Sequence, residues 1–298
     1  MNWSLTMNFS IIKASFPVDL ETLEEVKTLC AEAGNADRVS YNALMNLRES
    51  NELYSKGFFV LAYDDELNQL VGVASAIDVM GLDTYEWSLV VSPMYRQIGI
   101  GKALFKVLHE SLHERGAEGE LALVHENSTY GRKFLERFGF RYSFSEATFE
   151  AKATVSNLED HIFIRQFSEL DTNVLVQIFI EAFGDMRDES LELIEHNTTA
   201  EGSILWVAEM NGEVLGTLTT TKEGEVQWIT AFAVHPNSQG KGIGTALLNW
   251  ARDFALRNGE KFVMLDVETE NERALSVYEK AGFQKSMQVD YFVYSSKE

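Results

Sequence analysis

The chain of 298 residues has very little cysteine, since Cys30 is the only one. An intrachain disulfide is therefore impossible, which excludes a disulfide-stabilised fold and favours a reducing compartment, the cytoplasm. Cys30 lies among Leu23, Val26 and Leu29 at helical spacing. We therefore expect a small buried hydrophobic residue there rather than a catalytic thiol.

Positive charge is also scarce. Lys and Arg total 25 against 46 Asp and Glu, which gives a formal net charge of −21. Such an acidic chain repels nucleic acid and anionic membranes, so neither is expected as a partner. The charge is compatible with a cationic acceptor molecule, although an acidic composition also simply favours solubility. Neither a basic-then-apolar signal peptide nor an apolar run long enough to cross a bilayer is present, which argues against a membrane protein.

Proline is rare as well, and two of the three prolines mark a tandem repeat. A constant shift of 143 residues carries Val91, Pro93, Gly99, Ile100, Gly101, Ala103 and Leu104 onto Val234, Pro236, Gly242, Ile243, Gly244, Ala246 and Leu247. A chain of this length can hold two ordinary domains, each with its own core. We therefore predict an N-terminal domain over 1–152 and a C-terminal domain over 158–298, joined by the polar stretch 151–157.

The two copies show the same order of expected elements. The first has a strand over 9–12, helices over 19–33 and 41–54, strands over 58–62, 70–77 and 85–91, a helix over 101–115, a strand over 121–125 and a final helix. The second has a strand over 162–165, helices over 171–183 and 189–196, strands over 205–209, 214–220 and 226–234, a helix over 244–257, a strand over 262–267 and a final helix. Asp19, Ser128 and Asn271 are expected helix N-caps, and Gly139 and Gly282 are expected to end the two final helices.

A glycine-rich loop follows the strand ending at Val234 and leads into a helix, and the first copy repeats this layout. Unpaired amides and the positive end of a helix dipole favour an anion at such a place. A Walker P-loop requires G-x-x-x-x-G-K-[ST], which neither copy has. A dinucleotide site is a nearer rival, because Asp266 stands near the spacing of a ribose-binding acid. However, Thr245 occupies the place of the last glycine of that motif.

The downstream sequence separates these alternatives. The second copy reads Asn271-Glu272-Arg273-Ala274-Leu275-Ser276-Val277-Tyr278-Glu279-Lys280-Ala281-Gly282-Phe283. Together with Gln239-Gly240-Lys241-Gly242-Ile243-Gly244, this resembles the GNAT superfamily of N-acetyltransferases, with Q/R-x-x-G-x-G/A followed by N-x-x-A-x-x-x-Y-x-x-x-G-F. The first copy matches less completely over Val90–Phe140.

The resemblance implies an α/β (α+β) fold of two domains, each a mixed, mostly antiparallel sheet flanked by helices. Each sheet splays between its fourth and fifth strands, where acetyl-coenzyme A binds, and no metal is required. The implied coenzyme-binding residues of the second copy are Ala233, Val234, Gln239, Gly240, Lys241, Gly242, Ile243, Gly244, Thr245 and Asn271. Those of the first copy are Val91, Arg96, Gln97, Ile98, Gly99, Ile100, Gly101 and Lys102.

The resemblance also implies a reaction, transfer of an acetyl group to a primary amine of a small molecule or peptide. Tyr278 is then the catalytic acid that protonates the departing thiolate. In the first copy Leu135 takes the place of this tyrosine and Ser128 that of Asn271, which indicates a domain that has lost catalysis. Tyr130 is expected to point elsewhere. The alternative is a non-catalytic acyl-coenzyme A sensor or scaffold. Glu86, Glu225 and Gln227 are open candidates for the general base.

The segment His109-Glu110-Ser111-Leu112-His113 matches the zinc motif H-E-x-x-H. Its histidines fall on the helix face opposite Leu104 and Leu108, and no third ligand is evident. We therefore expect surface histidines and no metal.

Overall fold

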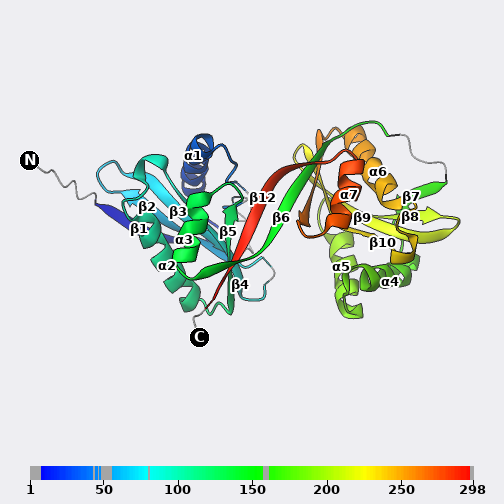
Figure 1. Ribbon diagram of the computed structural model, residues 1–298, viewed down its shortest axis with the longest axis horizontal. Coiled ribbons are helices and arrows are strands. Elements are labelled where there is room, and N and C mark those ends of the chain that lie inside the picture. The colour runs from blue at the N-terminus through cyan, green and yellow to red at the C-terminus, as the bar shows by residue number, and fades with distance from the viewer. Residues whose placement is uncertain are drawn as a thin grey trace, which may run out of the picture. The chain divides into compact units, whose positions relative to one another are not determined.

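The computed structural model describes residues 8–42, 44–45, 47, 56–79, 81–156 and 161–295. The chain divides into two compact units, one formed by Met1–Phe144 with Val289–Glu298 and the other by Ser145–Gln288 (Figure 1). Most of the helix expected over 41–54 lies outside the described residues.

The first unit contains a six-stranded sheet in the order β1-β2-β3-β4-β5-β12. Its strands are β1 (Phe9–Ser15), β2 (Gly57–Asp64), β3 (Gln69–Ile77), β4 (Thr84–Val91), β5 (Gly119–His125) and the end of β12 (Gln284–Tyr294). Its helices are α1 (Leu20–Asp37), α2 (Ile100–Glu114) and α3 (Thr129–Arg137). Only β4 and β5 pair in parallel, so the sheet is mixed and mostly antiparallel.

The second unit repeats this sheet in the order β7-β8-β9-β10-β11-β6. Its strands are β7 (Ile162–Gln166), β8 (Ser203–Met210), β9 (Glu213–Glu223), β10 (Val226–Val234), β11 (Phe262–Glu268) and the end of β6 (Phe140–Lys152). Its helices are α4 (Thr172–Phe183), α5 (Arg187–Thr199), α6 (Ile243–Arg257) and α7 (Glu272–Lys280). Here β10 and β11 form the parallel pair.

Each unit completes its sheet with a strand from the other half of the sequence. Residues 146–152 of β6 pair with β11, and residues 289–293 of β12 pair with β5. Neither strand was among the expected elements. The compact units therefore differ from the consecutive segments 1–152 and 158–298, because the strand that follows each final helix runs on into the other unit.

The expected helix ends are confirmed. The side chains of Asp19, Ser128 and Asn271 accept hydrogen bonds from the backbone N–H groups of Thr22, Gly131 and Ala274, respectively. Gly139 and Gly282 follow the capping residues Phe138 and Ala281 at the ends of α3 and α7. They take positive φ angles of 90° and 82°, a conformation that glycine adopts without strain. Cys30 is 2% exposed within an apolar cluster, as expected, and burial raises the pKa of its thiol to about 12.

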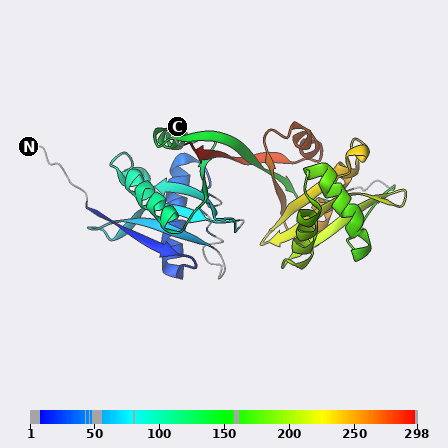
Figure 2. The same ribbon diagram turned by 90° about the horizontal axis from the view of Figure 1, so that it is seen from below.

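Helices cover both faces of the second sheet (Figures 1 and 2). α6 and α7 pack on one face, where Ile229 of β10 and Leu265 and Val267 of β11 belong to the same apolar cluster. α4 and α5 pack on the opposite face, where Ala233 joins their cluster. Side chains alternate along a strand. The faces of these residues therefore show to which face of the sheet the neighbouring side chains point.

Candidate active site

Both glycine loops place a left-handed glycine at the start of a helix. Gly99 precedes α2 with φ 103° and Gly242 precedes α6 with φ 85°. No side chain of the described residues caps either helix start. The first amides of α2 and α6 are thus available to an anion, as the loop pattern predicts.

The second glycines of the two motifs, Gly101 and Gly244, differ in the space around them. A Cβ at Gly244 would lie 3.2 Å from the Phe232 ring and 3.4 Å from Val277, whereas at Gly101 the nearest atom is 3.7 Å away. A side chain at Gly244 would therefore need Phe232 to shift by a few tenths of an ångström, while Gly101 has room for a methyl group.

The charged residues of the two loops are placed differently. Arg96 makes a two-pronged ion pair with Asp37, at 2.8 and 2.6 Å, and its Nε donates to the Val91 carbonyl. The pair lowers the pKa of Asp37 and neutralises the guanidinium. Gln239 donates to the matching Val234 carbonyl at 3.1 Å. Lys241 forms no ion pair within the described part of the chain, and its Nζ lies 3.4 Å from Ser238 Oγ. Arg96 of the first loop is therefore neutralised, whereas Lys241 of the second loop keeps its charge.

The parallel strands of the second unit separate early. β10 pairs with β11 only from Val226↔Phe262 to Trp228↔Met264, and the strands then diverge toward the glycine loop. In the first unit the corresponding pairing runs from Thr84 to Trp87. Under the 143-residue shift, Trp87 corresponds to Thr230. The parallel pairing of the first unit therefore continues two residues beyond the point where that of the second unit ends, at Trp228, and its gap is two residues shorter.

A β-bulge interrupts β10 beside this gap. The register with β9 shifts between Thr230 and Ala233, and Ala231 takes a φ of +47°. A bulge leaves residues outside the ladder and redirects their backbone groups. β4 pairs with β3 in unbroken register from Glu86 to Val91 and has no such bulge. The sequence reasoning missed this feature, because the Ala231-Phe232-Ala233 stretch contains neither glycine nor proline.

Tyr278 lies on α7 and is 6% exposed. Its ring packs among Phe149, Phe232 and Phe283 at centroid distances of 5.9 to 6.4 Å. Its hydroxyl has no hydrogen-bond partner among the residues that the structure describes, and burial raises its pKa to about 12. The ring is buried, but the hydroxyl oxygen is not one of the fully buried unpaired atoms, so it is open to a ligand. Leu135 fills the matching position with an apolar side chain, and Tyr130 is 77% exposed.

Two candidates for the general base lie away from the gap. Glu225 precedes β10, at the strand end farthest from the glycine loop, and forms an exposed ion pair with Lys261 at 2.6 Å. Gln227 is buried, two residues before Ile229, on the face of the sheet that α6 and α7 cover. Glu86 belongs to β4 of the first unit, where it pairs with Ile77.

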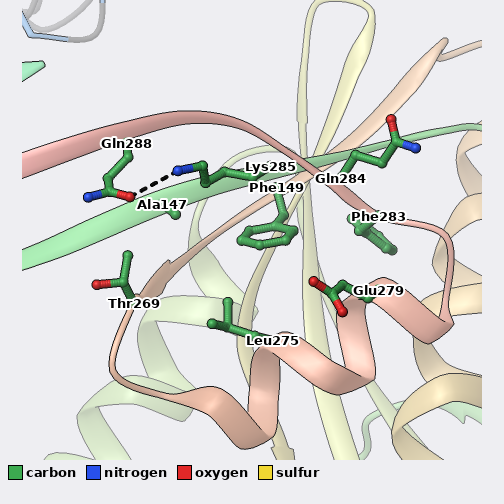
Figure 3. A pocket seen from close by; sticks show the side chains of 9 residues that line it. All are labelled: Ala147, Phe149, Thr269, Leu275, Glu279, Phe283, Gln284, Lys285 and Gln288. Atoms are coloured by element: carbon green, nitrogen blue, oxygen red, sulfur yellow. Dashed lines mark hydrogen bonds between the residues drawn. The ribbon is translucent and has the colours of Figure 1, made fainter. Parts of the chain in front are cut away.

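A cavity of about 480 Å³ lies beside α7, between Leu275 and Glu279 of the helix and the strands β6 and β12 (Figure 3). Phe149 and Phe283 form walls that it shares with the Tyr278 ring. None of the coenzyme-binding residues expected from the sequence lines it.

The first histidine of the H-E-x-x-H segment contacts a carboxylate and an aromatic ring. His109 Nδ1 lies 3.2 Å from Glu120 Oε1, and the His109 ring stacks on Phe105. Among the described residues, no group of three His, Cys, Asp or Glu side chains is arranged to hold a metal ion.

Comparison with known proteins adds independent findings. The family model described as the acetyltransferase (GNAT) family matches residues 21–140 and again 172–283. A mycothiol acetyltransferase of Paenarthrobacter aurescens (strain TC1) is 28% identical over 306 aligned positions, which cover 93% of each protein.

Two solved structures resemble the whole chain. A GCN5-related N-acetyltransferase from Sphaerobacter thermophilus has a TM-score of 0.76 at 20% identity and covers 97% of both chains. A tandem GNAT protein from the clavulanic acid biosynthesis pathway has a TM-score of 0.69 at 16% identity, over 97% of this chain and 100% of that one. These likenesses confirm the expected fold of two GNAT-like halves, each a mostly antiparallel sheet flanked by helices.

Proposed function

Because the chain belongs to the acetyltransferase (GNAT) family, we propose that it is an acetyl-coenzyme A-dependent N-acetyltransferase whose catalytic centre lies in the second unit. The acceptor is a primary amine of a small molecule or peptide. One observation carries this proposal: three features lie beside the gap between β10 and β11. They are the bulge in β10, the uncapped start of α6 and the Tyr278 hydroxyl, which has no hydrogen-bond partner among the described residues.

The residues of the second unit fit the coenzyme. The amides of Gly242, Ile243, Gly244 and Thr245 at the start of α6, with Gly240 and Lys241 before them, suit a pyrophosphate. Ala233 and Val234 line the edge of β10 along which the pantetheine chain would lie. Coenzyme A supplies an activated acetyl thioester, so the protein needs no nucleophile of its own.

Two groups of the second unit then serve the reaction. Backbone N–H groups at the bulge, around Ala231 and Phe232, face the charge that develops on the carbonyl oxygen. Removal of one such donor typically costs ~3–4 kcal/mol of transition-state stabilisation. The Tyr278 hydroxyl donates its proton to the departing sulfur.

For the first unit we propose binding of coenzyme A without catalysis, through the loop from Arg96 to Lys102. The unbroken register of β4 and the leucine at position 135 favour this non-catalytic role. Its affinity should be lower than that of the second unit, because Asp37 already neutralises Arg96.

We also propose a cytoplasmic protein that acts on a cationic acceptor. The single buried thiol suits a reducing compartment, and the net charge of −21 attracts cations. Within the described residues, no helix combines the length and the apolar character that a bilayer crossing requires.

The test is thiol release from acetyl-coenzyme A in the presence of a panel of primary amines that includes glucosamine, spermidine and a lysine-containing peptide. We expect release with at least one amine and a product heavier by one acetyl group. A chain that neither binds acetyl-coenzyme A nor releases thiol would disprove the proposed function.

A further inference from the structure

Asp266 lies at the edge of the gap between β10 and β11. The last parallel pair of these strands is Trp228↔Met264, so Asp266 is two residues beyond the point where they separate. Its neighbours Leu265 and Val267 belong to the core under α6 and α7. By strand alternation the Asp266 side chain projects from the opposite face of the sheet.

Tyr278 approaches the same gap from the other side. Its ring contacts Phe149 and Phe232, which belong to the cluster under α6 and α7. A phenol and a carboxylate therefore flank one opening in the sheet, on opposite faces. This arrangement suits an acyl transfer in which sulfur departs on one side and nitrogen approaches from the other.

Asp266 is partly accessible to solvent, although neighbouring protein atoms desolvate its carboxyl group. The residue is exposed, yet desolvation raises its pKa, an effect that its hydrogen bond with Thr148 reduces. Thr148 Oγ1 donates to Oδ1 at 2.6 Å, and Oδ2 has no hydrogen-bond partner in the described residues. One oxygen is thus held in place while the other is free to accept a proton from a ligand.

The repeat provides a second, independent observation. Under the 143-residue shift, Leu123 corresponds to Asp266 and Leu135 corresponds to Tyr278. The first unit thus has leucine at both positions, although it keeps the glycine loop and the order of strands. The first unit has the same order of strands without a carboxylate at this position, so the fold does not need one. Its absence together with that of the tyrosine indicates a shared role of the two groups in the second unit.

From this geometry we infer that Asp266 is the general base that takes the proton from the acceptor amine, on the face of the sheet opposite Tyr278. The inference rests on the proposed function.

An acceptor that arrives as an ammonium loses one proton to Asp266, which passes it to water. The nitrogen attacks the thioester carbon, and the C–S bond breaks as Tyr278 protonates sulfur. The nitrogen then loses a second proton through Asp266, and Tyr278 regains its proton from solvent. The products are an amide, the thiol and one proton released to water.

The surrounding charges suit such an acceptor. The titratable side chains that share this face on the adjoining strands are Glu268 of β11 and Glu146, Glu150 and Lys152 of β6. On β10 the face carries Trp228 and Thr230, and Thr230 donates to Asn197 of α5 at 3.4 Å. Three of these four groups are carboxylates, so the face attracts an ammonium and favours its protonated form. Transfer of the acetyl group then requires a base beside the acceptor.

The decisive variant is Asp266→Asn, which keeps the size of the side chain and its hydrogen bond with Thr148. Glu268→Gln is the matched control, since it removes a carboxylate from the same face of the same strand. Thiol release is followed against pH, with glucosamine, spermidine and the lysine-containing peptide as acceptors, with aniline as an amine that is uncharged at neutral pH, and with water alone.

We expect Asp266→Asn to lower kcat/KM for alkylamines at pH 7 by ~10²–10⁴-fold, the usual effect of a positioned base. The wild type should level off above the raised pKa of Asp266. The variant should instead gain rate with pH up to the pKa of the amine. The loss should be smaller for aniline, and acetyl-coenzyme A affinity should stay unchanged. Glu268→Gln should raise only the KM of the cationic acceptors and keep the kcat and the pH profile of the wild type, because it removes an attracting charge and no base.

Each outcome decides between the inference and the proposed function. If Asp266→Asn keeps the rate and pH profile of the wild type, or loses as much rate with aniline, Asp266 is not the base, and the proposed function stands. If Asp266→Asn does not fold, as judged by its thermal midpoint, Asp266→Glu is measured in its place. Because this variant keeps a carboxylate, its rate must still depend on pH as expected for a carboxylate base. A wild type that releases no thiol with any acceptor, including water, overturns the proposed function and this inference together.

Discussion

At the scale of single residues, the hydroxyl of Tyr278 is the most informative group. Three phenylalanine rings pack against the Tyr278 ring, and the hydroxyl has no hydrogen-bond partner among the described residues. Burial raises its pKa to about 12, so the phenol is protonated at every physiological pH. It always has a proton to donate, and we expect no alkaline loss of activity from this residue below a pH of about 11.

The variant Tyr278→Phe tests the assignment of the catalytic acid. Turnover should fall by ~10²–10⁴-fold while acetyl-coenzyme A binds as before, because only the proton donor is lost. The thermal midpoint should change little, since the ring packing is kept and no hydrogen bond is removed. Steady-state kinetics and calorimetry measure these two effects.

Tyr130→Phe is the control, because Tyr130 is exposed on the equivalent helix of the first unit. It should leave turnover unchanged. Nearly normal turnover by Tyr278→Phe, with chemistry shown to be rate-limiting, would remove Tyr278 from the mechanism and leave water as the proton donor.

At the scale of elements, the bulge separates the two otherwise similar strands β10 and β4. Ala231 is held at a φ of +47°, a left-handed conformation that costs a non-glycine residue ~1–2 kcal/mol. Strain of this kind persists where the surrounding structure enforces it, often at functional sites. In the proposed reaction, its benefit is a pair of redirected backbone amides beside the gap.

The variant Ala231→Gly should therefore raise the thermal midpoint of the second unit or leave it unchanged, since glycine takes positive φ without strain. Ser88→Gly at the equivalent position of β4 is the control. There the register is unbroken, and glycine should destabilise the strand by ~0.5–1 kcal/mol. If both variants lose the same stability, the left-handed geometry of Ala231 is not a source of strain.

The glycine loops allow a paired test of coenzyme binding. Gly244→Glu places a carboxylate where a Cβ already meets Phe232, and should abolish binding by the second unit through repulsion and steric blockage. Gly101→Glu has room for its Cβ, so it should act on the first unit through charge alone. Calorimetry of each variant with coenzyme A measures the number of sites and their affinities.

The double variant shows whether the two effects are independent. We expect two sites in the wild type, with the tighter one lost in Gly244→Glu. A single site that Gly244→Glu leaves intact would refute binding by the second unit.

At the scale of the whole molecule, the exchanged strands determine which fragments can fold. Residues 145–288 include the part of β6 that pairs with β11, with Ala147, Phe149 and Ala151 in the core. Residues 158–298 lack this strand. Loss of one buried phenylalanine side chain alone typically costs ~3–5 kcal/mol, a large share of the stability of a domain.

We therefore expect the fragment 145–288 to fold and to bind coenzyme A, and the fragment 158–298 to be unfolded or aggregated. Circular dichroism and thermal melting distinguish the two. A cooperative melt of 158–298 that equals that of 145–288 would show that the second unit does not need β6.

The sequence by itself determined the repeat, the family and most local structure. The glycine loops, the caps by Asp19, Ser128 and Asn271, and the elements around them follow from short-range rules, because capping and turn geometry depend on neighbours in the chain. The paired motifs also indicated Tyr278, since both lie within a single copy.

Only the tertiary structure decided the features that depend on distant partners. β6 and β12 exchange between the units, which depends on pairing between residues more than a hundred positions apart. The pairing of Arg96 with Asp37 likewise joins two distant segments, and it removes a charge that the sequence offered to the coenzyme. The bulge at Ala231 arises from register against β9 and has no local residue signal. For the same reason, the sequence could suggest a ribose-binding role for Asp266, but only the sheet shows which face it occupies.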